Sequence, residues 1–397
     1  MAVESQVAPQ SARVPFYNDP KIRSVAYQVA LFGTVALLIY GAASNAVENL
    51  RRAHIASGFG FWDQTAGFDI SQTLIEFSSS TSSYGQAFWV GLLNTLLVAV
   101  LGIILATILG FTIGICRLSK NWLLSRVATG YVELVRNVPL LLQLLFWYNA
   151  VLKALPDLRD SIPLWGGAFL NNRGLFLPLP VPKPGFGVVE IALLIGVIGA
   201  IAYRWWARKR QMATGQQAPV GWVTLALVVG LPVLVFVLWA SPLDFAYPDK
   251  GRFNIRGGVE VVPEFAALLV GLTIYTAAFI AEVVRAGILA VSKGQTEAAY
   301  SLGLRPRPTL RLVVVPQAMR VIIPPLTSQY LNLVKNSSLA VAIGYPDLVQ
   351  VFTGTVLNQT GQAVEVVAIT MAVYLTISLT TSLAMNIYNA RIALVER

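Results

Sequence analysis

The chain has 397 residues, of which 56% are hydrophobic and only 12% are charged, about half the charged share of a soluble globular domain. This composition excludes a soluble enzyme and predicts an integral membrane protein. The chain has one Cys (Cys116) and one His (His54), too few for a disulfide framework, a Cys/His zinc site or an iron–sulfur cluster. The formal net charge is +10, but the chain has no block of Lys or Arg. In a membrane protein such an excess of positive charge is typical of cytoplasmic loops and does not indicate a nucleic-acid partner.

Apolar stretches long enough to cross a membrane recur along the whole chain. A span needs about 20 residues to cross roughly 30 Å of hydrocarbon. On that criterion we expect an all-α integral membrane protein with about eight transmembrane helices. In chain order the spans are 25–43, 88–115, 131–152, 188–205, 220–239, 263–284, 321–343 and 364–387.

The distribution of Lys and Arg predicts the orientation. If the N-terminus lies inside, the inner segments hold 18 of these residues and the outer segments hold 9. By the positive-inside rule, both termini are expected on the cytoplasmic side. The first span has a rival interpretation as a cleaved signal peptide, but the long polar segment before it and its full length favour a retained helix.

Two connecting segments look inserted. Residues 44–84 are polar and are expected to form an exposed extracytoplasmic loop. Residues 154–186 are rich in proline, which favours an extended or irregular connection.

The loop between the sixth and seventh spans carries the clearest motif. It reads SKGQTEAAYSLGLRPRPTLRLVVVP over residues 292–316. Ser292 and Gln295 have the spacing of a capping box, and Gly303 is placed to end the helix that follows. A short helix of small residues beside Glu297 is suited to docking into a groove of another protein. An ordinary solvated loop helix is the alternative.

The motif itself resembles the EAA loop of bacterial ABC importer permeases. The residues that match are Glu297, Ala298, Ala299, Gly303, Val313, Val315 and Pro316, with Val where the family usually has Ile and Leu. In that family the loop forms a coupling helix seated in the cytoplasmic ATPase subunit. The resemblance therefore implies that ATPase coupling rests on Glu297, Ala298, Ala299, Gly303 and Pro316.

Further segments resemble the polar amino acid branch of these permeases. They are VELVRNVPLLLQLLFWYN (132–149), AEVVRAGI (281–288) and PPLTSQYLNLVKNSSLAVAIG (324–344). The extra first span, GFGFWDQTAGFDISQ (58–72) and the inserted hairpin resemble the AapQ/BztB-type permease subunit of general L-amino acid transport systems. The resemblance implies a five-helix ABC importer permease core plus one N-terminal helix and an inserted helical hairpin.

This resemblance also implies the domain organisation. A cytoplasmic tail (1–23), the extra N-terminal transmembrane helix (24–43) and a periplasmic loop (44–84) precede the first part of the core (85–153). An inserted periplasmic loop and helical hairpin (154–260), the second part of the core (261–390) with the EAA loop (292–316), and a cytoplasmic tail (391–397) follow.

Polar groups inside the spans are candidates for a substrate path, because a buried ionisable group must face protein or a cavity. Lys335 lies deep in the seventh span beside Asn332, Asn336 and Ser337. It is either a partner for a substrate carboxylate or part of an interhelical pair. Asn94 in the second span either lines the path or bridges helices. Two Glu/Arg sets near the inner interface predict structural pairs: Glu133 with Arg136, and Glu282 with Arg285.

The resemblance implies a multi-pass permease subunit in the bacterial inner (plasma) membrane that translocates L-amino acids. Its partners would be a cytoplasmic ATP-binding subunit, a second permease subunit as a heterodimer, a periplasmic amino-acid-binding protein and the lipid bilayer, with no nucleic acid. The chain contains no Gly-Lys dipeptide and so no phosphate loop, which places ATP hydrolysis on another polypeptide. We expect no catalytic site, no metal and no cofactor on this chain. The alternatives are a stand-alone ion-coupled secondary amino acid transporter, which its few intramembrane acids disfavour, and a structural subunit of a membrane complex.

Overall fold

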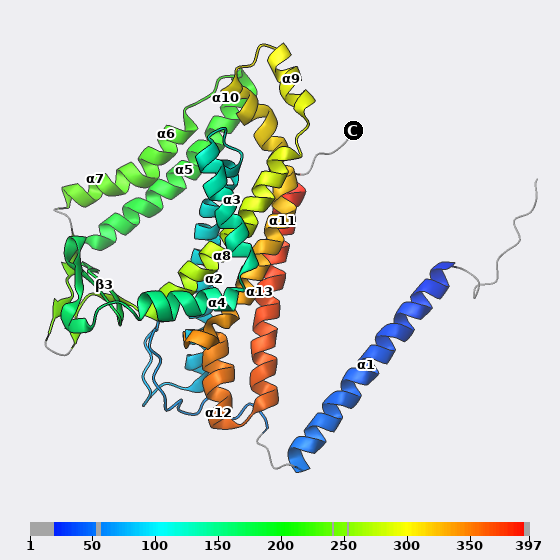
Figure 1. The fold of residues 1–397 in the computed structure, drawn as a ribbon, viewed down its shortest axis with the longest axis vertical. Coiled ribbons are helices and arrows are strands. Elements are labelled where there is room, and N and C mark those ends of the chain that lie inside the picture. Colours follow the sequence, from blue (N-terminus) through cyan, green and yellow to red (C-terminus); the bar gives the residue numbers. More distant parts are fainter. Residues whose placement is uncertain (1–19, 53–56, 240–241, 252–253, 393–397) are drawn as a thin grey trace, which may run out of the picture.

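The computed structural model describes residues 20–52, 57–239, 242–251 and 254–392 (Figure 1). Seven helical segments among them are long and apolar enough to cross a membrane, and Leu140–Leu152 forms a shorter apolar helix. The expectation of a helical membrane protein with about eight spans is therefore confirmed, although several bounds differ. His54 and the outer parts of the two expected tails, 1–19 and 393–397, lie outside the described residues.

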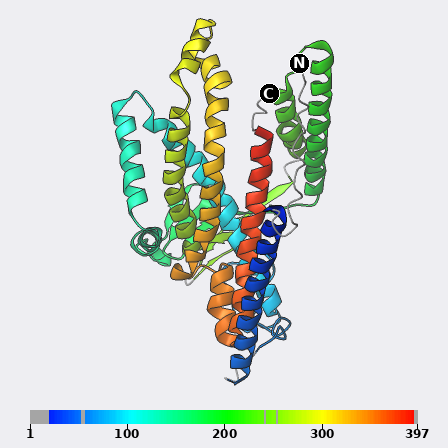
Figure 2. The same cartoon turned by 90° about the vertical axis from the view of Figure 1, so that its right-hand side faces the viewer.

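Four long helices lie side by side at the centre of the bundle. They are α2 (Tyr84–Arg117), α8 (Pro263–Leu289), α11 (Val315–Asn336) and α13 (Ala363–Ile392), shown in Figures 1 and 2. α8 packs against both α2 and α11, and it is the most buried span. A Cβ atom added at Gly114 of α2 would lie 2.8 Å from the Ala281 carbonyl oxygen of α8. Glycine at this position therefore lets the two backbones approach closely, as small residues do between membrane helices.

The third expected span, 131–152, is not one helix. α3 (Trp122–Asn137) begins earlier and ends at Val138, whose backbone is extended with φ −100° and ψ 126°. Pro139 explains the break, because a proline ring disfavours the helical conformation in the preceding residue. The chain continues as α4 (Leu140–Leu145) and the π-helix η2 (Phe146–Leu152), and α4 runs across the bundle in Figure 1.

The seventh span is longer than the expected 321–343. Helical structure runs from Pro306 to Ile343 through α10 (Pro306–Thr309), the π-helix η6 (Leu310–Val314), α11 and the 3-10 helix η7 (Ser337–Ile343). Pro324 and Pro325 lie inside α11 without ending it. A turn at residues 344–347 then leads to the π-helix η8 (Val349–Val356) and α12 (Leu357–Thr360).

The insert between the third and sixth spans contains short strands and a helical hairpin. The hairpin consists of α5 (Phe186–Thr214), α6 (Val220–Leu225), the π-helix η5 (Ala226–Gly230) and α7 (Leu231–Leu238). The strands are β1 (Ile162–Leu164), β2 (Ala168–Asn171), β3 (Gly174–Leu177), β4 (Leu179–Pro182), β5 (Leu243–Ala246), β6 (Asp249–Lys250), β7 (Ile255–Arg256) and β8 (Val259–Val261). Two 3-10 turns, η3 (Leu158–Asp160) and η4 (Trp165–Gly167), flank β1.

The strands pair so that the insert leaves and rejoins the bundle at one place. The largest sheet is antiparallel in the order β1-β2-β3-β8, and Leu175 of β3 pairs with Val261 of β8. β4 pairs with β5, and β6 pairs with β7. Strands β1–β4 occupy the proline-rich segment, so its predicted extended character is confirmed.

The polarity of residues 44–84 predicts an exposed loop, and the structure differs in two places. Residues up to Arg52 continue α1 (Pro20–Arg52). Phe61 is only 2% exposed and packs with Tyr84 of α2 and Phe352 of η8 in one apolar cluster. The aromatic side chains of this segment are the physical reason, because they bury large apolar areas against the bundle.

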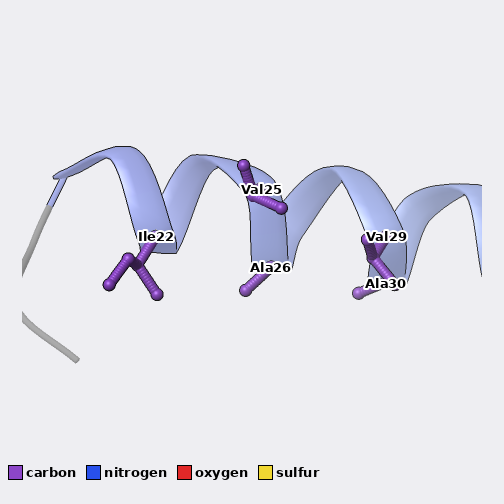
Figure 3. A pocket seen from close by; sticks show the side chains of 5 residues that line it. All are labelled: Ile22, Val25, Ala26, Val29 and Ala30. Carbon is purple, nitrogen blue, oxygen red and sulfur yellow. The ribbon is translucent and has the colours of Figure 1, made fainter. Parts of the chain in front are cut away.

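Helix α1 stands apart from the bundle in Figure 1, and none of its span is buried by other described residues. Figure 3 shows Ile22, Val25 and Val29 with two alanines lining a shallow apolar depression formed by this helix alone. An apolar helix that the other described residues leave uncovered is suited to contact lipid or another subunit.

Candidate coupling helix and intramembrane polar pocket

Helix α9 (Lys293–Ser301) lies at one end of the bundle, beyond the ends of α8 and α11 (Figure 1). It ends in a Schellman motif: the Gly303 N–H donates to the Tyr300 carbonyl (2.9 Å) and the Leu304 N–H donates to the Ala299 carbonyl (3.1 Å). Gly303 has φ +79°, a left-handed conformation that favours glycine. Its predicted role as the residue that ends the helix is confirmed.

The predicted capping box at the start of α9 is wrong. Ser292 is the N-cap residue but makes no side-chain capping hydrogen bond. The Gln295 side chain turns elsewhere, and its Oε1 accepts a hydrogen bond of 3.1 Å from Gln317 Nε2 in the first turns of α11. This contact ties α9 to the start of the seventh span.

One side of α9 is packed against the protein and the rest is open. Ala299 is 4% exposed, and α9 contacts α10 and η6. Glu297 and Ala298 are exposed, and Leu302 just after the helix is 83% exposed. A carboxylate, a small residue and an apolar residue therefore face outward together. Of the other predicted coupling residues, Gly303 is exposed, and Pro316 is exposed at the start of α11.

Glu282 joins two helices near this end of the bundle. Its carboxylate accepts hydrogen bonds from Arg285 Nη2 at 2.6 Å and from Arg117 Nη1 at the end of α2. The predicted Glu282–Arg285 pair is confirmed, and Arg117 is a partner that the sequence did not reveal. The Glu133–Arg136 pair is not formed among the described residues, and Arg136 lies over the Phe279 ring at 5.1 Å from its centroid.

A polar pocket of about 340 Å³ lies between α8 and α11. It is lined by Tyr275, Thr276 and Phe279 of α8 and by Gln329, Asn332 and Asn336 of α11. On α11 the three amides are spaced by three and four residues, which places them on one helix face. The pocket thus presents amide, hydroxyl and aromatic groups within the membrane-spanning bundle. The ring of Phe279 also makes the cation–π contact with Arg136.

The structure brings only part of the predicted substrate-path set together. Asn332 and Asn336 line the pocket, whereas Lys335 is exposed and does not line it. Ser337 is buried, and its Oγ donates to the Val334 carbonyl at 2.8 Å. Gln329 and the α8 residues complete the pocket; the spacing of Gln329 from Asn332 is the sequence signal that points to it.

Asn94 is fully buried and bridges segments far apart in the chain. Its Nδ2 donates to the carbonyl oxygens of Gln72 and Pro346, each at 2.9 Å. The adjacent Thr95 Oγ1 accepts a hydrogen bond of 3.0 Å from the Leu348 N–H. In this structure α2 therefore holds the turn after η7, and Asn94 does not line the pocket.

The chain is similar to known transport proteins over nearly its whole length. Residues 192–394 match the family described as "Binding-protein-dependent transport system inner membrane component". The chain is 55% identical to the general L-amino acid transport system permease protein AapQ of Rhizobium johnstonii, over 96% of this chain and 94% of that protein. It is 50% identical to the putative amino-acid ABC transporter permease protein YhdX of Escherichia coli, over 96% and 97%.

A third relative is less similar in sequence but is matched over nearly its whole length. The glutamate/glutamine/aspartate/asparagine transport system permease protein BztB of Rhodobacter capsulatus is 41% identical over 96% of each chain. These matches confirm the resemblance drawn from the EAA motif and favour a transport subunit over both an enzyme and a stand-alone secondary transporter. The chain belongs to the binding-protein-dependent transport system inner membrane components, the multi-pass permease subunits of ABC importers.

Proposed function

We propose that this chain translocates L-amino acids across a bacterial inner membrane and that a separate ATPase subunit drives it through α9. The observation that carries the proposal is the contact between Gln295 of α9 and Gln317 of α11. The same helix, α11, carries the pocket amides about 15 residues further on, roughly 22 Å at 1.5 Å per residue. Movement of α9 by the ATPase would therefore reach the pocket along one helix.

Each predicted coupling residue has a role in this proposal. Glu297 and Ala298 face the ATPase cleft, because they are exposed. Ala299 holds α9 on the permease, because it is buried and its carbonyl closes the Schellman motif. Gly303 provides the left-handed turn, and Pro316 lies where the π-helix η6 passes into α11, so this junction lacks one backbone N–H donor.

The substrate path is proposed to pass the pocket between α8 and α11. The names of the relatives specify amino acid cargo. A zwitterionic amino acid suits a site of amide and hydroxyl groups, which donate to a carboxylate and accept from an ammonium group. We assign Asn332 and Asn336 to this contact. Lys335, which is exposed on a single chain, is proposed to face the path or the second permease when two permeases associate.

The remaining partners follow from the two ends of the bundle. The end with α9 receives the cytoplasmic ATP-binding subunit, and the opposite end receives the periplasmic amino-acid-binding protein. The inserted hairpin and its strands lie outside the five-helix core. α13 runs from the α12 end toward the α9 end (Figure 1), which supports a cytoplasmic C-terminus. In Figure 1 the Pro20 end of α1 points toward the α9 end of the molecule and its Arg52 end toward the α12 end, which supports a cytoplasmic N-terminus.

Glu297→Lys tests the coupling role. In proteoliposomes that contain the complete importer, we expect ATP-driven amino acid uptake to fall at least about tenfold, since a reversed charge faces the ATPase cleft. Glu48→Lys is the matched control, because this glutamate is exposed on α1 and lies outside the permease core. Both variants should insert at the level of the original chain. Unchanged uptake by Glu297→Lys would refute the coupling role of α9.

A further inference from the structure

The end of the helical hairpin where α5 stops carries a concentrated positive charge. Arg204, Arg208, Lys209 and Arg210 fall within two turns, and the sequence contains no Asp or Glu from Ile191 to Leu243. No ion pair involves these four cations within the described part of the chain. Lys209 lies over the Trp205 ring at 5.4 Å, and Arg210 lies over the Trp206 ring at 5.4 Å.

A cavity of about 590 Å³ opens at this end of the hairpin. Its lining is Ile201, Arg204, Trp205, Arg208, Gln211 and Val220, so α5 supplies most of it and the start of α6 closes it. Two guanidinium groups thus lie beside apolar side chains. A ligand that fits must have an anionic part and a hydrocarbon part.

The two arms of the hairpin pack against each other, and the outer surface of the hairpin is exposed and apolar. Ala192, Gly196 and Ala200 are buried at the contact between α5 and the returning helices, where a Cβ at Gly196 would collide with the Leu227 carbonyl. Ile198 and Ile201, in contrast, are 59% and 65% exposed. The cavity therefore lies at the end of a helix pair whose exposed apolar surface is suited to contact lipid. Figure 1 shows this end on the same side of the molecule as α9.

We propose that this cavity is a binding site for a phospholipid with a negatively charged headgroup. The phosphate would bind Arg204 and Arg208, and the glycerol backbone and first acyl carbons would lie on Ile201, Trp205 and Val220. Tryptophan is suited to this level of the membrane, and basic pockets on the cytoplasmic side of membrane helices bind anionic headgroups. The assignment to the cytoplasmic leaflet rests on the proposed function, which places α9 in the cytoplasm; the lipid chemistry does not depend on transport.

The test compares lipid binding by the full-length chain purified in detergent. Native mass spectrometry measures the affinity for phosphatidylglycerol and for phosphatidylcholine with the same acyl chains. We expect Arg204→Gln/Arg208→Gln to weaken phosphatidylglycerol binding on the order of twenty-fold to thirty-fold, because each cation near a membrane contributes about a fivefold factor. Phosphatidylcholine binding should not change, and Arg204→Lys/Arg208→Lys should retain most of the selectivity.

The matched control also removes two positive charges, but from another part of the chain at the same end of the molecule. Lys120→Gln/Arg126→Gln alters two exposed cations, one in the α2–α3 turn and one in α3, and should leave phosphatidylglycerol affinity within about twofold. An equal loss in this control, or no loss in the hairpin variant, would overturn the site. Displacement of the lipid by millimolar glycerol phosphate or inorganic phosphate would also overturn it, since the site would then recognise any phosphate.

A photoreactive phosphatidylglycerol gives a second measurement that needs no variant. The expected crosslinks fall on residues 201–220 of the original chain in proteoliposomes, and the phosphatidylcholine probe should label this segment much less. Labelling of the segment that is equal for the two probes would refute the proposal, even if the double variant does not fold.

Discussion

The close contact between α2 and α8 allows a sharp test of the packing near the end of the bundle where α2 stops. Gly114→Ala adds a Cβ atom that would lie 2.8 Å from the Ala281 carbonyl oxygen and 2.8 Å from Val284 Cβ. Both distances are shorter than ordinary van der Waals contact, and the carbonyl belongs to a helix backbone that cannot rotate away. Overpacking of this kind costs about 1–3 kcal/mol.

The opposing effect is the helix propensity of alanine, which favours it over glycine by about 1 kcal/mol. Gly130→Ala measures that effect by itself, because a Cβ at this exposed position of α3 meets no atom within 4 Å. We therefore expect Gly130→Ala to raise the free energy of unfolding by about 0.5–1 kcal/mol. The free energy of unfolding of Gly114→Ala should be about 1–3 kcal/mol lower than that of Gly130→Ala.

The assay is reversible unfolding in mixed detergent micelles, followed by tryptophan fluorescence on the purified chain. The two variants differ from the original by the same single methyl group, so the comparison isolates the contact between α2 and α8. Equal unfolding free energies for Gly114→Ala and Gly130→Ala, within about 0.5 kcal/mol, would show that these helices do not approach as closely as described.

Two further predictions concern the polar groups inside the bundle. Asn94→Ala should lower the free energy of unfolding by about 1–3 kcal/mol, because the buried carbonyls of Gln72 and Pro346 lose their donor. Hydrogen exchange at residues 344–348 should accelerate in this variant, and unchanged exchange would argue against the bridge. Asn336→Leu should raise the KM of amino acid uptake at least about threefold with ATPase activity retained; an unaltered KM would remove Asn336 from the substrate path.

Spans were predictable from the sequence because hydropathy and helix rise are local properties. The break in the third span was visible in principle, since Pro139 restricts Val138. The apolar run that follows, Leu140–Leu152, hid it. α13, which has no such interruption, lies close to its predicted bounds.

The parts that could not be predicted depend on partners far away in the chain. The local pattern at Ser292 and Gln295 favours a capping box, but in the structure the Gln295 side chain accepts a hydrogen bond from Gln317. Asn94 likewise bonds to Pro346, and only the folded bundle brings these residues together. Glu282 illustrates both cases, because its i,i+3 partner Arg285 was predicted and Arg117 was not.

The central claim is that α9 docks on a separate ATPase, and a site-specific crosslink tests it most directly. Leu302 is 83% exposed beside the Glu297 face, so a photoreactive p-benzoylphenylalanine at this position reaches whatever covers α9. Trp165, which is fully exposed in the 3-10 turn η4 of the insert, provides the control position. In native membranes we predict that position 302 forms an adduct with a soluble ATP-binding subunit and that position 165 does not. No such adduct at position 302, in a chain that still transports amino acids, would contradict the account.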